Sequence, residues 1–275
     1  MSMKTILLPT DYSEHSRNAI EYALALFKGS DQRFLLMNAY YMPHAGAVIM
    51  TSIEDILRKS SEEEMELFVQ ELTSAHLDMA ERIDHTIVYG DPYIAIQSTL
   101  KEHNDVGLIV MGTTGASGIK GILIGSVTAQ IVKNAPSAVL AVPFDAEYAH
   151  PERIAFASDN SEMERTDLQA LLSIAKLHGA SIHVFNVAND DPEVHEKEPV
   201  RGGVSAFEGI EHDVRTTTDQ DLEAGILQFV NDRSCDMLTI VHHRYSTIEQ
   251  LFHKSASKQL ALHTHVPLLV LKEKL

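Results

Sequence analysis

The chain repeats itself, and this repeat limits the possible folds more than any other feature of its 275 residues. The segment ILLPTDYS near the start aligns with the later segment IAFASDNS at an offset of 148 residues. The same offset pairs Asn38 with Asn186. An internal repeat indicates two copies of one structural unit, and the chain is long enough for two domains with separate cores. We therefore expect one domain at residues 1–148 and a second at residues 149–275.

The order of apolar segments predicts the fold class. Each copy begins with a short apolar strand, an aspartate, a serine that can cap a helix (Ser13, Ser161) and a pattern of helical period that ends near a glycine (Gly29, Gly179). In the first half we expect strands at 5–8, 34–39, 85–88, 107–111 and 138–142, and later helices near 53–80, 92–103 and 125–134. Apolar runs such as LIVM suit strands that are buried on both faces. The alternation predicts an α/β fold, with two tandem doubly wound parallel five-stranded sheets.

The second copy is shorter than the first. Near the ends of the halves, Pro136 pairs with Pro267 at an offset of only 131, so the second copy lacks 148 − 131 = 17 residues. The first copy has room for a long helix between Asn38 and His85. The corresponding stretch of the second copy opens with NDDPEVHEKEPVRGG, for which we expect a mobile loop with at most a short helix at VSAFEGI.

Charge and composition exclude several classes of partner. The formal net charge is −17, divided as 10 − 19 = −9 for residues 1–148 and 12 − 20 = −8 for the rest. An acidic chain is a poor match for nucleic acid or an anionic membrane. Pro9 and Asp11 interrupt the first apolar residues before a signal-peptide core can form, and no apolar run is long enough for a membrane span. We therefore expect a cytoplasmic protein. Cys235 is the only cysteine and is expected to be structural.

A glycine-rich segment is the clearest candidate for a functional site. The stretch MGTTGASGIKGILIGSV, Met111 to Val127, carries five glycines in seventeen residues. Glycine permits close approach to the backbone, and in doubly wound sheets ligands bind at the carboxyl ends of strands. The residues Gly125, Ser126 and Val127 open the next expected helix, whose free N–H groups can hold phosphate oxygens without a lysine. A purely structural loop is the alternative, since the segment matches neither of the best-known phosphate loops.

The spacing of Gly112, Gly115, Gly125 and Ser126 closely resembles a motif of the universal stress protein family. ATP-binding members of that family are similar in having glycine, two residues, glycine, nine residues, glycine, and serine or threonine between the fourth strand and the fourth helix. The resemblance covers almost the whole chain as a tandem pair. It implies a Rossmann-like fold of the adenine nucleotide alpha hydrolase-like type in each half.

The resemblance also implies which residues of the first half bind ATP. Asp11 corresponds to the nucleotide-contacting aspartate, and Ala39 falls where the family's backbone meets adenine. The residues Gly125, Ser126 and Val127 would hold the phosphates. The Gly90–Pro92 turn matches the turn after the family's third strand. The full set of candidate ATP-binding residues is Pro9, Thr10, Asp11, Ala39, Met111, Gly112, Gly115, Gly125, Ser126 and Val127.

The second half departs from the motif at every glycine. At the offset of 131, Gly112, Gly115 and Gly125 become His243, Ser246 and Ala256, whereas Ser126 is retained as Ser257. Side chains then stand where phosphate would approach. We expect one intact ATP site and one degenerate site, with Asp159 as a relic of the second.

The function expected from these features is ATP binding by a stress-response module that senses or signals. The alternative is a slow ATPase or phosphoryl-transfer enzyme that uses the same site with Mg²⁺ or Mn²⁺. The segment offers Ser117, Lys120, Ser126 and Thr128 but no recognisable base paired with them, so we assign no catalytic residue. A third interpretation is a sensor of AMP or another adenine nucleotide.

Two further expectations concern metals and assembly. Fifteen histidines invite a metal hypothesis, but no acidic ligand or cysteine accompanies the histidines of the second half, so we expect surface histidines and no metal site. The two halves are expected to pack through their last strands, SAVLAV and PLLVL, as an intramolecular pseudo-dimer. Pairing of two chains into a homodimer is left open.

Overall fold

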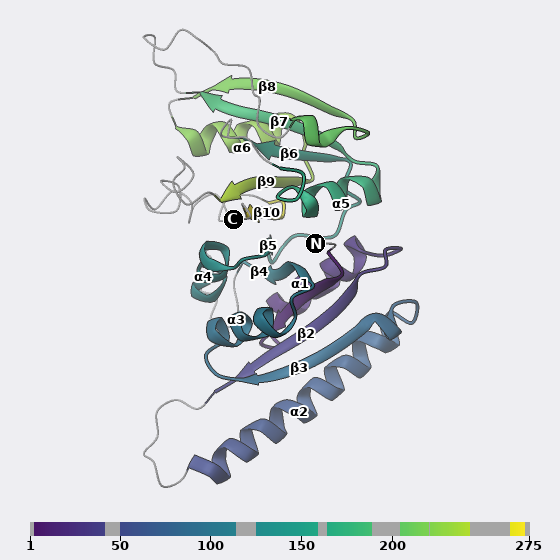
Figure 1. Cartoon of the computed structure of the whole chain (residues 1–275), viewed down its shortest axis with the longest axis vertical. Coiled ribbons are helices and arrows are strands. Elements are labelled where there is room, and N and C mark those ends of the chain that lie inside the picture. Colours follow the sequence, from purple (N-terminus) through teal and green to yellow (C-terminus); the bar gives the residue numbers. More distant parts are fainter. Residues whose placement is uncertain are drawn as a thin grey trace.

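The computed structural model describes residues 3–41, 50–113, 125–158, 164–188, 204–219, 221–242 and 265–272. Within these residues ten strands form one sheet in the order β3-β2-β1-β4-β5-β10-β9-β6-β7-β8. Figure 1 shows the strands stacked along the long axis of the molecule, with β5 and β10 in the middle. We call β1–β5 with their helices the first unit, and β6–β10 with their helices the second unit.

Within each unit all strand pairs are parallel, as the alternation of segments predicts. The strands of the first unit are β1 (Thr5–Thr10), β2 (Arg33–Tyr40), β3 (Ile83–Tyr89), β4 (Val106–Gly112) and β5 (Ala138–Val142). Those of the second unit are β6 (Arg153–Ala157), β7 (Ser181–Ala188), β8 (His212–Thr218), β9 (Met237–His242) and β10 (Leu268–Lys272). The one antiparallel pair joins the units, because β10 lies beside β5 with Leu269 opposite Leu140.

Helices cover both faces of the sheet. The helices are α1 (Glu14–Leu26), α2 (Met50–Ala75), α3 (Pro92–Glu102), α4 (Ser126–Asn134), α5 (Gln169–His178) and α6 (Leu222–Asp232), with short 3-10 turns η1 (Ala80–Arg82) and η2 (Val204–Phe207). One core lies under α1, α2 and α5, and a second core lies under α3, α4 and α6. The sheet is therefore doubly wound, and the strands that lie between the two cores are buried on both faces.

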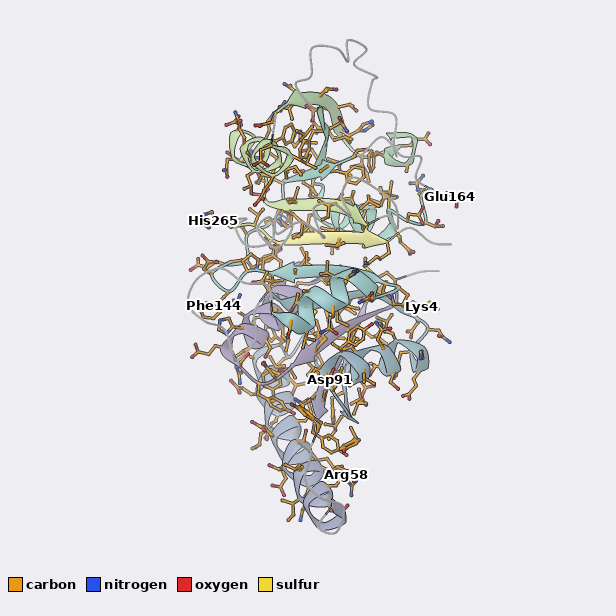
Figure 2. All side chains as sticks on the ribbon, turned by 90° about the vertical axis from the view of Figure 1, so that its left-hand side faces the viewer. Lys4, Arg58, Asp91, Phe144, Glu164 and His265 are labelled. Atoms are coloured by element: carbon orange, nitrogen blue, oxygen red, sulfur yellow. The ribbon has the colours of Figure 1, made fainter. Side chains whose placement is uncertain are left out.

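The units differ most between their second and third strands. The first unit has the 26-residue helix α2 there, whereas the described part of the second unit has only the four residues of η2. Figure 2 shows that α2 around Arg58 extends beyond the sheet. The expected short helix at VSAFEGI is thus present as η2, and residues 189–203, expected to be a loop, lie outside the described residues.

Two matching hydrogen bonds mark the repeat in the structure. The Nδ2 atom of Asn38 donates to the carbonyl oxygen of Thr10 at 2.8 Å, and Nδ2 of Asn186 donates to that of Ser158 at 2.8 Å. Each bond ties the second strand of a unit to the end of its first strand. The asparagines that align at the offset of 148 therefore have the same structural role in both units.

Helix ends agree with the sequence patterns in part. The Ser13 side chain caps α1 by accepting from the Ser16 N–H, and Gly179 ends α5 in the left-handed region at φ 66°. The expectation that Ser161 caps the corresponding helix is wrong, because α5 begins only at Gln169, after Leu168, which makes no side-chain cap. No helix among the described residues is long and apolar enough to span a membrane.

Candidate functional site

The order of strands in the first unit creates a crevice at the ends of β1 and β4. Chain connections leave β1 and β4 toward opposite faces of the sheet, since α1 belongs to one core and α4 to the other. Doubly wound proteins bind ligands at this switch point, outside the carboxyl ends of the strands. The structure has a pocket of about 560 Å³ at this place.

The turn from β1 to α1 forms one wall of the pocket. The Oδ1 atom of Asp11 accepts hydrogen bonds from the Ser13 hydroxyl at 2.5 Å and from the Ser13 N–H at 3.2 Å. Between them, Tyr12 has a φ of 60°, a left-handed conformation that is uncommon for a residue with a large side chain. The Thr10 hydroxyl stabilises this turn by accepting from the Tyr12 N–H at 3.0 Å. The turn holds the exposed Asp11 at the mouth of the pocket.

A buried polar network fixes this turn from behind. The Tyr12 hydroxyl donates to the Ser61 carbonyl oxygen at 3.3 Å, and the Ser61 hydroxyl donates to Oδ1 of Asn38 at 2.7 Å. Burial raises the pKa of Tyr12 to about 12, so its hydroxyl keeps its proton as a donor. The network ties β1, β2 and α2 together, and α2 thus contributes to the site without lining it.

The turn from β4 to α4 forms the opposite wall. The Gly125 N–H donates to the Thr113 carbonyl oxygen at 2.7 Å, and the Thr128 hydroxyl donates to the Gly112 carbonyl oxygen at 2.9 Å. These bonds hold the first turn of α4 against the end of β4. No described side chain caps α4. The first N–H groups of a helix carry partial positive charge, so this end of α4 is suited to an anion.

The pocket has a polar end and an apolar end. The polar end is formed by the two turns just described and by the Ser16 hydroxyl, which lies 3.1 Å from that of Thr10. The apolar end is formed by side chains of β2, β4 and α3: Met37, Ala39, Ile96 and Met111. At the rim lie Pro92, which begins α3, and Tyr41, whose side chain is about half exposed. The arrangement matches a ligand with a flat apolar part and an anionic part.

Nine of the ten candidate residues from the sequence line this one pocket: Pro9, Thr10, Asp11, Ala39, Met111, Gly112, Gly125, Ser126 and Val127. The tenth, Gly115, lies outside the described residues. Asp159, Ser117, Lys120, His243, Ser246, Ala256 and Ser257 also lie outside them, so the expected loss of the second site is not visible there. The binding role of the nine residues stays a prediction.

Sequence reasoning missed several pocket residues. Met37 lies two residues before Ala39 on β2, so both side chains point to the same face of the sheet. Ile96 lies one helical turn after Pro92. These spacings could have identified both residues once Ala39 and Pro92 were chosen. No such spacing in the sequence pointed to Ser16 or Tyr41.

The other chemical candidates lie away from the pocket. Cys235 is buried, and burial raises the pKa of its thiol to about 11, as suits a structural cysteine. No group of three or more metal-ligating side chains occurs in the part of the chain that the structure describes. His150 and His178 lie with their Nδ1 atoms 3.2 Å apart, and burial lowers the pKa of His178.

The fold and the site define the class: a doubly wound α/β protein with a pocket at the switch point of its first unit. Residues 3–143 and 203–272 match the sequence model of the universal stress protein family. These segments make up more than half of the chain. The chain therefore belongs to the universal stress protein family, as a tandem member.

Individual relatives agree with this assignment. The chain is 32% identical over 140 residues to universal stress protein MJ0531 of Methanocaldococcus jannaschii, covering 50% of this chain and 81% of that protein. It is 31% identical over 140 residues to a universal stress protein of Thermus aquaticus, covering 50% of this chain and 98% of that protein. Each match covers half of this chain and most of the relative, as expected for a tandem chain.

Solved structures agree with the fold of the whole chain. A universal stress protein from Archaeoglobus fulgidus DSM 4304 has a TM-score of 0.71 at 22% identity, covering 99% of this chain and 97% of that one. A putative universal stress protein from Pseudomonas aeruginosa UCBPP-PA14 has a TM-score of 0.59 at 12% identity, covering 98% and 93%. Both share the two-unit architecture over nearly their full length.

Proposed function

We propose that this protein is an ATP-binding stress-response module whose first unit holds the nucleotide. The observation that carries the proposal is the convergence of β1, β2, β4 and the start of α4 on one pocket, whose lining combines apolar side chains with the first residues of a helix. Residues selected from a phosphate-binding motif and from two separate strand ends line the same pocket. A common ligand is the simplest reason for such an arrangement.

The pocket gives each part of ATP a place. Adenine would lie against Ala39, with Met37, Ile96 and Met111 as its apolar surroundings. The phosphates would accept hydrogen bonds from the N–H groups of Ser126 and Val127 at the start of α4. Asp11 would accept from a ribose hydroxyl at the mouth of the pocket, because an ionised carboxylate only accepts.

Described residues of the second unit support a single site per chain. At the offset of 148, Met37 corresponds to Phe185 and Ala39 to Val187, both larger side chains. Phe185 is fully buried and stacks on Phe229 of α6, with ring centroids 3.9 Å apart and an interplanar angle of 9°. A Cβ atom at Gly225 would lie 2.8 Å from Cγ1 of Val187, so α6 already lies close to this strand. At the positions that correspond to Met37 and Ala39, the second unit thus has larger side chains packed against α6, which would leave less room for adenine.

The domain boundary falls near residue 148, in the connection between β5 and β6. The two units act as an intramolecular counterpart of a domain pair, through the antiparallel contact of β5 and β10. A divalent cation such as Mg²⁺ or Mn²⁺ would accompany the ATP phosphates, with the exposed Asp11 as the nearest carboxylate of the pocket.

The phosphate assignment can be tested with Gly125→Val. Gly125 has φ −55° and ψ 147°, a conformation open to any residue, so the variant should fold while placing a side chain at the start of α4. Loss of hydrogen bonds to a charged phosphate should weaken ATP binding about 10- to 100-fold in calorimetry. The control is Ala129→Val on the same helix, outside the pocket. Unchanged affinity in a folded Gly125→Val protein would show that the phosphates bind elsewhere.

A further inference from the structure

Two side chains of the second unit bind the carboxyl-terminal ends of two helices in the first unit. The first is Lys272, at the end of β10, which is only 8% exposed. Its Nζ atom donates to the carbonyl oxygen of Val132, and to that of Lys133 at 3.3 Å. These carbonyls belong to the last turn of α4, where backbone acceptors have no partner within the helix. Figure 1 shows α4 close to the junction of the two units.

The second side chain is His178, the last residue of α5. Its Nε2 atom lies 2.7 Å from the carbonyl oxygen of Leu26, the last residue of α1. Because a carbonyl oxygen only accepts, Nε2 carries the proton and donates it. The last carbonyl group of α1 therefore also accepts a hydrogen bond from the second unit.

The two helices held in this way are the two that begin at the pocket. The helix α1 starts just after Asp11 and presents Ser16 to the pocket, and α4 starts with Ser126 after Gly125. With nine residues, α4 is only about 14 Å long. A helix this short moves as a rigid body, so a shift at its last turn displaces the N–H groups at its first turn.

We propose that Lys272 and His178 are positioning residues for the nucleotide site of the first unit. The proposal rests on the proposed ATP site, and it gives the second unit a defined role, which is to fix the far ends of α4 and α1. When its amine is protonated, Lys272 also places a positive charge beside the negative end of the α4 dipole, which favours an anion at the other end. The second unit thus contributes to ATP affinity without touching ATP.

The experiment compares Lys272→Met with Lys176→Met in the full chain. Methionine keeps the length and apolar stem of lysine but cannot donate. Lys176 is an exposed residue of α5, which covers the opposite face of the sheet from α4, and it serves as the control. Backbone hydrogen exchange is measured without nucleotide, ATP affinity by calorimetry, and global stability by denaturant unfolding. We expect Lys272→Met to speed exchange selectively in α4 and to weaken ATP binding about fivefold. The Lys176→Met protein should match the wild type in hydrogen exchange of α4 and in ATP affinity.

Several outcomes decide the proposal. Unchanged exchange in α4, or faster exchange with ATP affinity unchanged within twofold, would overturn it and leave Lys272 as a contact between units only. If Lys272→Met does not fold, His178→Leu is compared in the same way, with faster exchange expected in the last turn of α1 and weaker ATP binding. If the wild-type protein binds no ATP, the proposed function fails, while the exchange data still decide whether the second unit holds the helices.

Discussion

At the scale of the residue, the hydroxyl of Thr239 is the clearest unsatisfied group in the sheet. Thr239 lies on β9, paired with Phe156 of β6 and Leu269 of β10, and is fully buried. Its Oγ1 atom has no hydrogen-bond partner among the described residues. Burying a hydroxyl without a partner costs free energy that an apolar side chain of the same shape would not cost.

We therefore expect Thr239→Val to raise the free energy of unfolding by about 1 kcal/mol. Thr99→Val is the matched control, because the buried Thr99 hydroxyl donates to the Ala95 carbonyl oxygen at 3.0 Å. That substitution removes a hydrogen bond and should lower stability by a similar amount. Urea denaturation of both variants provides the measurement, and a loss of stability in Thr239→Val would contradict the assignment.

The positions of single residues were predictable where a motif or a strand end defined them. Asp11 and Gly125 could be chosen from the sequence because one follows a strand and the other opens a helix. The left-handed φ of Tyr12 could not be predicted, since its side chain is held by the Ser61 carbonyl oxygen and by contact of its ring with Phe68, both on α2. Such long-range support has no local signal in the sequence.

At the scale of the element, α2 shows how a helix divides between core and solvent. Phe68 is 4% exposed; its ring meets that of Tyr12 edge-on at 5.8 Å and lies under the Arg17 guanidinium at 4.6 Å. Its neighbour Leu67 is 68% exposed. The structure places this helix at Met50–Ala75, so it begins and ends a few residues before the expected range of 53–80.

The two neighbours should respond very differently to truncation. Phe68→Ala leaves a cavity under α2 and should cost about 3–5 kcal/mol of unfolding free energy, whereas Leu67→Ala should change it by less than about 0.5 kcal/mol. Guanidinium unfolding of the two variants makes the comparison. Equal effects would mean that α2 does not pack on the sheet through the face that carries Phe68.

At the scale of the whole molecule, the repeat predicted the α/β class and the parallel strands of both units. The last strands of the two halves were expected to pack together, and β10 does lie beside β5. The contacts of Lys272 and His178 with the first unit could not be predicted, because each joins residues about 140 or more positions apart in the sequence. Side-chain contacts of this kind depend on how the units meet, which the repeat alone does not specify.

The junction should also make stability depend on pH. Burial lowers the pKa of Lys272 from 10.5 to about 7, so between these values the unfolded chain binds more protons than the folded one. The wild type should therefore gain stability relative to Lys272→Met as the pH rises from about 7 toward 10.5. We expect a gain of roughly 2 kcal/mol in the free energy of unfolding. This is less than the whole pKa shift would give, because hydrogen bonds to two carbonyl oxygens favour the charged amine. A pH-independent difference between the two proteins in denaturant unfolding would contradict this.

We propose that the two similar units provide one ATP site, in the first unit. The number of ATP molecules bound per chain is measured by calorimetric titration of the purified protein, after removal of any bound nucleotide. We expect one ATP bound per chain, and we expect Gly125→Val to abolish or strongly weaken that single event. Two ATP molecules per chain, or one whose binding is unaffected by Gly125→Val, would contradict the claim.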